Sequence, residues 1–298
     1  MNRIIVIVGP TAVGKTKLSI ELAKKYNGEV INADSTQIFK GLDIATAKVT
    51  EEEKQNIPHH LLDIREVTEN YTVYDYQKDG RKCIETILEN NKTPIIVGGT
   101  GLYLKALLYD YKFEEEVPII NSYDNYTNEE LYNKLLTVDP NTEIHVNNRK
   151  RVVRALNYYE QTKEPLSTKE KTDKELYDAI YIGLTTDREK LYERINLRVD
   201  IMVENGLLDE AKKIFDSNIS TKAILTPIGY KELFPYFENK ETLEFCLGRI
   251  KQNSRRYAKR QYTWFNNQMD VQWFNVDFNS FDNTIKEITD YIDKMNKA

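Results

Sequence analysis

Cysteine and histidine are both scarce in this chain of 298 residues, which contains two cysteines and three histidines. Cys83 and Cys246 lie far apart and lack the spacing of a metal-binding or redox pair, so we expect reduced, buried thiols and a cytoplasmic protein. Three histidines are too few for a histidine-rich metal centre. These scarcities exclude a disulfide scaffold.

Long apolar runs are also absent. No stretch approaches the roughly 18 continuous apolar residues that a membrane span requires. The first apolar run, residues 4–8, is short and continues directly into a glycine-containing loop, so we expect neither a secretory signal nor a membrane anchor. The chain is long enough to bury a sizeable core in one large or two modest domains.

Acidic residues are missing between Glu244 and Asp270, although the whole chain has a net charge of −5. Charges more than about 8 Å away are largely screened at physiological salt, so a phosphate responds to the local patch. Aromatic residues Tyr257, Tyr262 and Trp264 are interleaved with the basic ones, a pattern that fits either RNA binding or a solvated basic face above buried aromatics. The basic residues of this stretch are Arg249, Lys251, Arg255, Arg256, Lys259 and Arg260.

A phosphate-loop spacing, G-x-x-x-x-G-K-[ST], follows the apolar run of residues 4–8 and precedes a helical pattern over residues 16–26. A strand, a glycine turn and a helix N-terminus direct backbone N–H groups at one point and bind an anion there. Lys15 adds a positive charge, and the Thr16 hydroxyl suits Mg²⁺. The sequence therefore predicts a phosphate or diphosphate site made of Gly9, Pro10, Thr11, Ala12, Val13, Gly14, Lys15 and Thr16.

Strand-like and helix-like segments alternate along most of the chain. Buried strands are predicted at residues 4–8, 29–33, 94–98, 180–184 and 271–276. Helices are predicted at residues 16–26, 75–90, 187–216 and 240–265. The alternation predicts a doubly wound, parallel α/β core domain. We expect this core to comprise residues 1–111 and 176–298, with residues 112–175 forming a small helical insertion domain.

Ligands of such sheets gather beyond the carboxyl ends of the strands, where three polar residues stand out. Asp34 follows a strand and is either a general base or Mg²⁺ ligand, or a helix N-cap. Gln37 either completes a capping box or hydrogen-bonds a base edge. Thr100, within residues 98–101, offers a hydroxyl in a loop that either approaches a ligand or only connects strand to helix.

Two further groups of arginines carry possible anion contacts. Arg194 and Arg198 are four residues apart and share a helix face, which suits a diphosphate, although the nearby acidic residues favour a surface helix laced with ion pairs when the spacing is taken alone. Arg151 and Arg154 form a second basic group in the insertion. Two separated basic patches favour an extended polyanion over a small molecule.

Taken together, the motifs resemble the tRNA dimethylallyltransferase family. The matching stretches run in the family's order through nearly the whole chain: residues 9–16, 31–38, 41–48, 59–64, 97–103, 151–156, 194–202, 206–207, 228–232 and 255–265. The insertion departs from the family pattern, because it is shorter before Asp139 and has Val146 and Asn148 where Pro and Asp are commoner.

The resemblance implies transfer of a dimethylallyl group from dimethylallyl diphosphate to N6 of the adenosine 3′-adjacent to the anticodon, with Mg²⁺ at Thr16. It further implies that Asp34 accepts the N6 proton, Thr100 lines the meeting point of the substrates and Arg198 binds diphosphate oxygens. The insertion would grip the anticodon arm of tRNA, and the protein is expected to be a monomer. The tRNA contacts that the resemblance implies are Asp34, Ser35, Thr36, Gln37 and Thr100, and the two basic patches add Arg151, Arg154, Arg256, Lys259 and Arg260 as expected contacts.

Three other activities share the phosphate loop. They are a small-molecule kinase, an isopentenyltransferase that acts on free adenylate, and an ATP-dependent RNA-binding switch without transfer chemistry. The first two have no need of two basic patches, and the third would hydrolyse ATP and leave adenosine unmodified.

Overall fold

The computed structural model describes residues 3–113, 120–168 and 174–297. These residues form two compact units, the first from residues 1–109 and 175–298 and the second from residues 110–174. The expected insertion, residues 112–175, starts and ends within two residues of the second unit. No helix in the described ranges combines the length and the apolar character needed to cross a bilayer.

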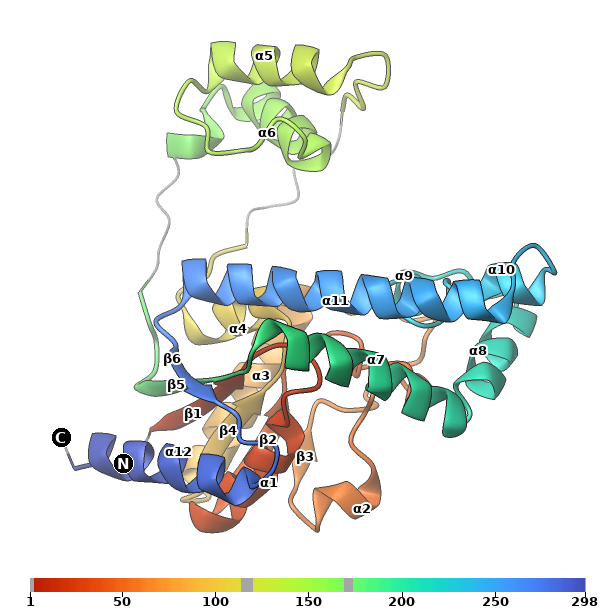
Figure 1. The fold of residues 1–298 in the computed structure, drawn as a ribbon. Helices are drawn as coiled ribbons and strands as arrows, with labels where there is room; N and C mark the ends of the chain where they lie inside the picture. The colour runs from red at the N-terminus through yellow and green to blue at the C-terminus, as the bar shows by residue number, and fades with distance from the viewer. Residues whose placement is uncertain (1–2, 114–119, 169–173, 298) are drawn as a thin grey trace. The chain divides into compact units, whose positions relative to one another are not determined.

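A six-stranded sheet with the order β3-β2-β4-β1-β5-β6 is the centre of the first unit (Figure 1). Every pairing between neighbouring strands is parallel, which confirms the predicted α/β class. Val97 of β4 pairs with Ile7 of β1 and Asn32 of β2, so the loops after these strands open at one edge. The strands are β1 (Ile4–Val8), β2 (Gly28–Asn32), β3 (His59–His60), β4 (Thr93–Val97), β5 (Ala179–Thr185) and β6 (Gln272–Asn275).

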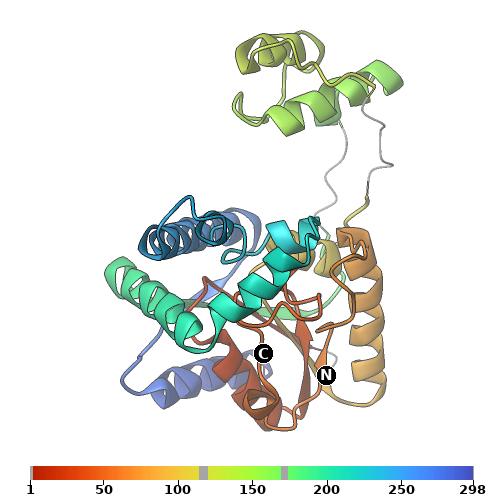
Figure 2. The same cartoon turned by 90° about the vertical axis from the view of Figure 1, so that its right-hand side faces the viewer.

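Helices cover both faces of the sheet, because alternate residues of each strand face opposite cores. Ile4 and Val6 of β1 belong to one core, whereas Ile5 and Ile7 belong to the other. The first core packs against α3 and α4 and the second against α1 and α12, as the turned view also shows (Figure 2). The helices of this unit are α1 (Lys15–Lys25), α2 (Glu51–Lys54), α3 (Val73–Glu89), α4 (Gly101–Leu108), α7 (Arg188–Glu204), α8 (Leu207–Asp216), α9 (Lys222–Leu225), α10 (Phe234–Phe237), α11 (Leu243–Gln268) and α12 (Phe281–Met295).

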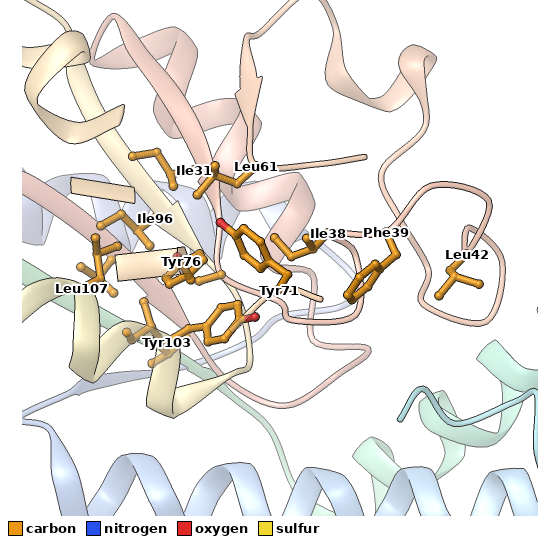
Figure 3. Packing of buried hydrophobic residues seen from close by; sticks show 14 of the residues in the cluster. Ile31, Ile38, Phe39, Leu42, Leu61, Tyr71, Tyr76, Ile96, Tyr103 and Leu107 are labelled. Carbon is orange, nitrogen blue, oxygen red and sulfur yellow. The ribbon is translucent and has the colours of Figure 1, made fainter. Parts of the chain in front are cut away.

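An aromatic pair in the first core fixes the helix that begins beside the predicted site. Tyr76 of α3 and Tyr103 of α4 stack with ring centroids 4.0 Å apart, near Ile31 and Ile96 of the sheet (Figure 3). Both rings are buried. Because α4 starts at Gly101, this packing sets the position of the Thr100 loop.

Two differences from the expected elements have a clear local cause. The helix expected over residues 187–216 is interrupted, because Gly206 has φ of 97° and caps the N-terminus of α8. Strand β3 was not predicted, since His59 and His60 carry no apolar run and pair only with Val30 and Ile31.

The second unit is helical in its described residues, with α5 (Asn128–Val138), α6 (Arg149–Thr162) and a 3₁₀ turn at Leu166–Thr168. Leu131 and Leu135 of α5 are fully buried in a small core shared with α6. Thr127 caps α5 by accepting a hydrogen bond from the backbone N–H of Glu130. The unit therefore has an apolar core of its own.

Candidate active site

The backbone of the phosphate loop adopts a conformation that requires glycine at two positions. Gly9 and Gly14 have φ of 136° and 93°, in a region that side chains with a Cβ rarely adopt. A Cβ at Gly9 would also lie 2.6 Å from the carbonyl oxygen of Leu184 in β5. The loop thus passes in close contact with β5, and α1 begins directly after it at Lys15.

Lys15 folds back over this loop and is strongly perturbed. Its Nζ donates hydrogen bonds to the carbonyl oxygens of Gly9 at 3.0 Å and Pro10 at 2.7 Å. Burial, reinforced by the nearby Arg198 guanidinium and opposed by the Asp34 carboxylate, lowers the pKa of Lys15 to about 7. An anion bound here would stabilise the charged form of this lysine.

Two arginines of α7 reach the same loop. Arg198 donates a hydrogen bond to the Thr11 hydroxyl at 2.7 Å, and Arg194 donates one to the Ala12 carbonyl at 3.0 Å. The Arg194 guanidinium also lies 3.8 Å from the ring centroid of Phe278. This pair therefore faces the phosphate loop, and the alternative of a surface ion-pair network is wrong. Sequence reasoning gave a role only to Arg198, although the four-residue spacing pointed to Arg194 as well.

Asp34 lies in a tight turn directly after β2. Its Oδ1 accepts hydrogen bonds from the backbone N–H of Thr36 at 2.9 Å and from the Thr36 hydroxyl at 2.7 Å. No helix begins here, so the N-cap alternative is wrong and the carboxylate instead forms a local turn of the Asx kind. The half-buried carboxylate acts electrostatically on Lys15 and Arg198, which places all three charges at the same edge of the sheet.

Thr100 joins the turn after β2 to the loop after β4. Its hydroxyl oxygen accepts a hydrogen bond from the backbone N–H of Ser35 at 3.0 Å and lies 3.3 Å from the Ser35 hydroxyl. A Cβ at Gly98 would approach the Ala33 carbonyl group to 2.2 Å, so the two segments touch through backbone. The structure therefore brings Asp34, Ser35 and Thr100 together.

Helix α11 packs against the loop at residues 98–101 through residues to which sequence reasoning gave no role at this loop. Gln261 donates a hydrogen bond to the Gly99 carbonyl at 3.1 Å, and a Cβ at Gly101 would meet the Trp264 ring at 2.2 Å. Tyr257, one turn before Gln261, lies on the same helix face. Burial and then the nearby Asp34 carboxylate raise the pKa of Tyr257 above its usual value. The helix thus presents one polar and aromatic stripe to the loop at residues 98–101.

The aromatic residues Tyr262 and Trp264 of α11 pack against the two cores of the first unit. Tyr262 contacts the Thr185 hydroxyl through its own hydroxyl at 2.8 Å and packs in the second core. Trp264 packs against the first core. The alternative of a solvated basic face above buried aromatics describes these two rings better.

The basic residues of α11 divide into two groups. Arg256, Lys259 and Arg260 are exposed, whereas Arg255 donates a hydrogen bond to the Asn196 side-chain oxygen of α7 at 2.6 Å. In the second unit, Arg151 and Arg154 are exposed on α6. Five of the arginines and lysines expected to contact tRNA thus reach the surface.

The side chains of this site fit a metal cation that is coordinated mainly by oxygens of a bound phosphate compound and of water, with few protein ligands. No group of three or more His, Cys, Asp or Glu residues able to hold a metal occurs in the part of the chain that the structure describes. The half-buried Thr16 hydroxyl, in the first turn of α1, has no hydrogen-bond partner among the described residues. One protein oxygen together with phosphate and water oxygens is a common set of Mg²⁺ ligands.

Comparisons with known proteins agree with this geometry. The family described as IPP transferase matches residues 37–268. The tRNA dimethylallyltransferase of Anoxybacillus flavithermus is 47% identical over 301 aligned residues, covering 98% of this chain and 96% of the relative. A crystal structure of the tRNA isopentenylpyrophosphate transferase of Staphylococcus epidermidis has 44% identity and a TM-score of 0.75, covering 98% and 99% of the two chains. A eukaryotic dimethylallyltransferase captured acting on tRNA has 31% identity and a TM-score of 0.84, covering 98% of this chain and 80% of the other. The chain, matched nearly from end to end, belongs to the IPP transferase family.

Proposed function

We propose that this protein transfers a dimethylallyl group from dimethylallyl diphosphate to N6 of the adenosine 3′-adjacent to the anticodon in tRNA, giving N6-(dimethylallyl)adenosine. One observation carries the proposal: the carboxylate of Asp34 lies within electrostatic reach of Lys15 and Arg198 at the phosphate loop. A binding site for a diphosphate leaving group thus adjoins a base. The names of the relatives support the same reaction.

The phosphate loop binds the diphosphate in this reaction. Backbone N–H groups at the start of α1 point toward the anion, and Lys15 and Arg198 balance the charge that develops as the C–O bond breaks. Thr16 would hold Mg²⁺, which would supply further charge neutralisation at the diphosphate. The remaining members of the site are Gly9, Pro10, Thr11, Ala12, Val13 and Gly14.

Asp34 acts on the acceptor. As the C–O bond of the donor breaks, a bond forms between its C1 carbon and the adenine N6, diphosphate leaves, and an N6 proton passes to the Asp34 carboxylate. An exocyclic amine is a weak nucleophile, so a positioned base contributes roughly 10²- to 10⁴-fold to the rate. Thr100, fixed against Ser35, lines the place where donor and amine meet.

The anticodon arm of tRNA binds around this centre. Ser35, Thr36 and Gln37 contact the target nucleotide, and the exposed cations of α11 and α6 contact phosphates. The target adenosine must leave its stack, which costs only a few kcal/mol in a single-stranded loop. We further propose that the helical insertion grips the anticodon arm, and that the protein works in the cytoplasm as a monomer. The phosphate contacts are assigned to Arg151, Arg154, Arg256, Lys259 and Arg260.

Nucleoside analysis tests the reaction directly. Purified protein is incubated with Mg²⁺, dimethylallyl diphosphate and one of two acceptors, an anticodon stem-loop RNA or free AMP. We expect dimethylallyladenosine in the RNA and none from AMP. Product from AMP alone would assign the chain to nucleotide isopentenyl transfer.

A parallel reaction with ATP in place of the prenyl donor tests the remaining alternatives. We expect neither phosphorylated product nor RNA-stimulated ATP hydrolysis. ATP hydrolysis with unmodified adenosine would instead indicate an RNA-binding switch.

A further inference from the structure

The segment of residues 41–48 matched the family but has no role in the reaction described above. Its backbone converges on a single carboxylate, that of Glu210 in α8. Glu210 accepts hydrogen bonds from the N–H groups of Asp43 at 3.0 Å, Ile44 at 2.9 Å and Ala45 at 3.1 Å. Hydrogen bonds to an ionised acceptor are about twice as strong as neutral ones, so this carboxylate fixes the path of the loop.

A second matching segment, residues 228–232, also contacts the Glu210 carboxylate. The Tyr230 hydroxyl donates a hydrogen bond to Glu210 Oε1 at 2.7 Å, and Tyr230 is fully buried. Gly229 has φ of 137°, and a Cβ there would lie 2.8 Å from the Ala45 Cβ. Three segments that are distant in sequence therefore meet at one carboxylate.

The other end of the loop is fixed by buried Lys48. Its Nζ donates to the Phe39 carbonyl at 2.8 Å and pairs with the Asp43 carboxylate at 2.6 Å. Phe39 and Leu42 pack in the first core (Figure 3). The loop is thus held at both ends.

The held loop constrains the side chain of Gln37. Its Nε2 donates to the carbonyl oxygens of Thr46 at 3.0 Å and Ala47 at 3.3 Å. Carbonyl oxygens only accept hydrogen bonds. If the Gln37 amide flipped, its own oxygen would face these two acceptor oxygens, so the observed orientation is fixed. Gln37 Oε1 has no partner among the described residues and is not a buried atom, so it is presented as an acceptor.

We propose that Glu210 and Tyr230 are positioning residues: by fixing the backbone of residues 43–47 they hold Gln37 as an obligate acceptor and so select a base that carries an exocyclic amine. The inference rests on the proposed function. Asp34 and Gln37 share one turn, in which the Gln37 N–H donates to the Asp34 carbonyl at 3.2 Å. An adenine N6 has two hydrogens, one for the Asp34 carboxylate and one for Gln37 Oε1. Guanine would place its O6 acceptor against the Gln37 oxygen.

Two anticodon stem-loop RNAs test this selection by fluorescence anisotropy. One carries adenine at the target position and the other carries purine, which lacks the amine. The neutral hydrogen bond to Gln37 contributes about 0.5–1.5 kcal/mol, or roughly 2- to 13-fold in affinity, and the bond to the Asp34 carboxylate adds its own share, so the wild-type protein should bind the adenine RNA more tightly by at least that factor. Glu210→Gln, which places an amide NH₂ against backbone donors, should remove the Gln37 share and lower the ratio of the two affinities roughly 2- to 13-fold, leaving the share of the Asp34 bond. Tyr230→Phe, which keeps the ring, should lower the ratio partially.

The matched control is Asp209→Asn, which removes an exposed carboxylate from the neighbouring position of α8. It should leave the ratio unchanged. Hydrogen exchange at the amides of residues 43–45 should accelerate in Glu210→Gln and stay unchanged in the control, a readout that needs no catalysis.

Three results would overturn the proposal. They are equal wild-type affinity for both RNAs, a full ratio retained in Glu210→Gln, and an equal loss of affinity for both RNAs in that variant, which would mark a merely structural residue. Failure of wild-type protein to prenylate the adenine RNA would instead refute the proposed function, because the affinity ratio is measured without the donor.

Discussion

The exposed cations of α11 offer a quantitative test of RNA binding. Arg256, Lys259 and Arg260 are exposed, and no acidic residue interrupts the helix between Glu244 and its end. Each phosphate contact adds about 0.7–0.9 to the slope of log affinity against log salt concentration. Replacing all three by alanine should therefore lower that slope by roughly 2.1–2.7.

The slope converts to affinity over a convenient range of salt. Raising KCl fourfold, from 50 to 200 mM, should weaken the wild-type complex roughly 20- to 40-fold more than the triple variant. The deficit of the variant should accordingly be large at low salt and small at high salt. Binding of the diphosphate should be nearly unchanged, because these residues lie on the exposed side of α11.

Fluorescence anisotropy with a labelled anticodon stem-loop RNA, titrated at several KCl concentrations, measures this slope. A control variant removes the same charge elsewhere, by replacing the exposed Lys286, Lys294 and Lys297 at the C-terminal end of the chain with alanine. Its slope should remain that of the wild type. An unchanged slope in the α11 variant, or an equal change in both variants, would refute the reasoning, because net charge or solvent contact alone would then explain the data.

Three further predictions address the catalytic centre and the fold. Asp34→Asn should lower the single-turnover rate roughly 10²- to 10⁴-fold and leave both substrate affinities within about twofold, whereas a parallel loss of affinity would make the residue a structural one. The pKa of Lys15 is lowered from 10.5 to about 7 in the folded protein. Between pH 7 and 10.5 the unfolded chain therefore binds a proton that the folded protein lacks, so the free energy of unfolding of the wild type rises with pH over this range. The stability advantage of Lys15→Met, from urea unfolding, should therefore shrink by about 1.4 kcal/mol per pH unit between pH 7.5 and 9.5, and a constant difference would contradict the shift. Gly101→Ala, whose Cβ meets the Trp264 ring at 2.2 Å, should lower the free energy of unfolding by about 1–3 kcal/mol. Gly248→Ala, with nothing within 4 Å of its Cβ, should raise it by about 0.5–1 kcal/mol, and equal effects would show that the contact yields freely.

Most of the sheet was predictable because its strands, apart from β3, contain short apolar runs. Five of the strands correspond to continuous runs such as residues 4–8, and the spacing of the phosphate loop placed Gly9 and Lys15 at the end of the first one. Parallel order then put the residues that follow β2 and β4 at the same edge. Local pattern and topology together were enough to bring Asp34 near Thr100.

Contacts across long sequence separations were not predictable. Nothing in the neighbourhood of Gln261 indicates that its amide bonds Gly99, 162 residues away. The charge pattern also does not indicate that Arg255, alone among its basic neighbours Arg256, Lys259 and Arg260, donates a hydrogen bond to the amide oxygen of Asn196 in α7. Such pairings depend on how helices pack on one another, which periodicity does not specify.

The dependence of the Gly98–Gly101 loop on α11 also sets when the protein can become competent during synthesis. At about 5–20 residues per second, Gln261 and Trp264 are made roughly 8–30 s after the loop that they support. Until then the Gly99 carbonyl lacks its Gln261 donor and Gly101 lacks its aromatic cover. A nascent chain would therefore hold the phosphate loop and Asp34 before it holds α11, which braces the neighbouring loop. A chain terminated before α11 would lack the residues that brace the loop of the proposed active site, and we expect it to be inert.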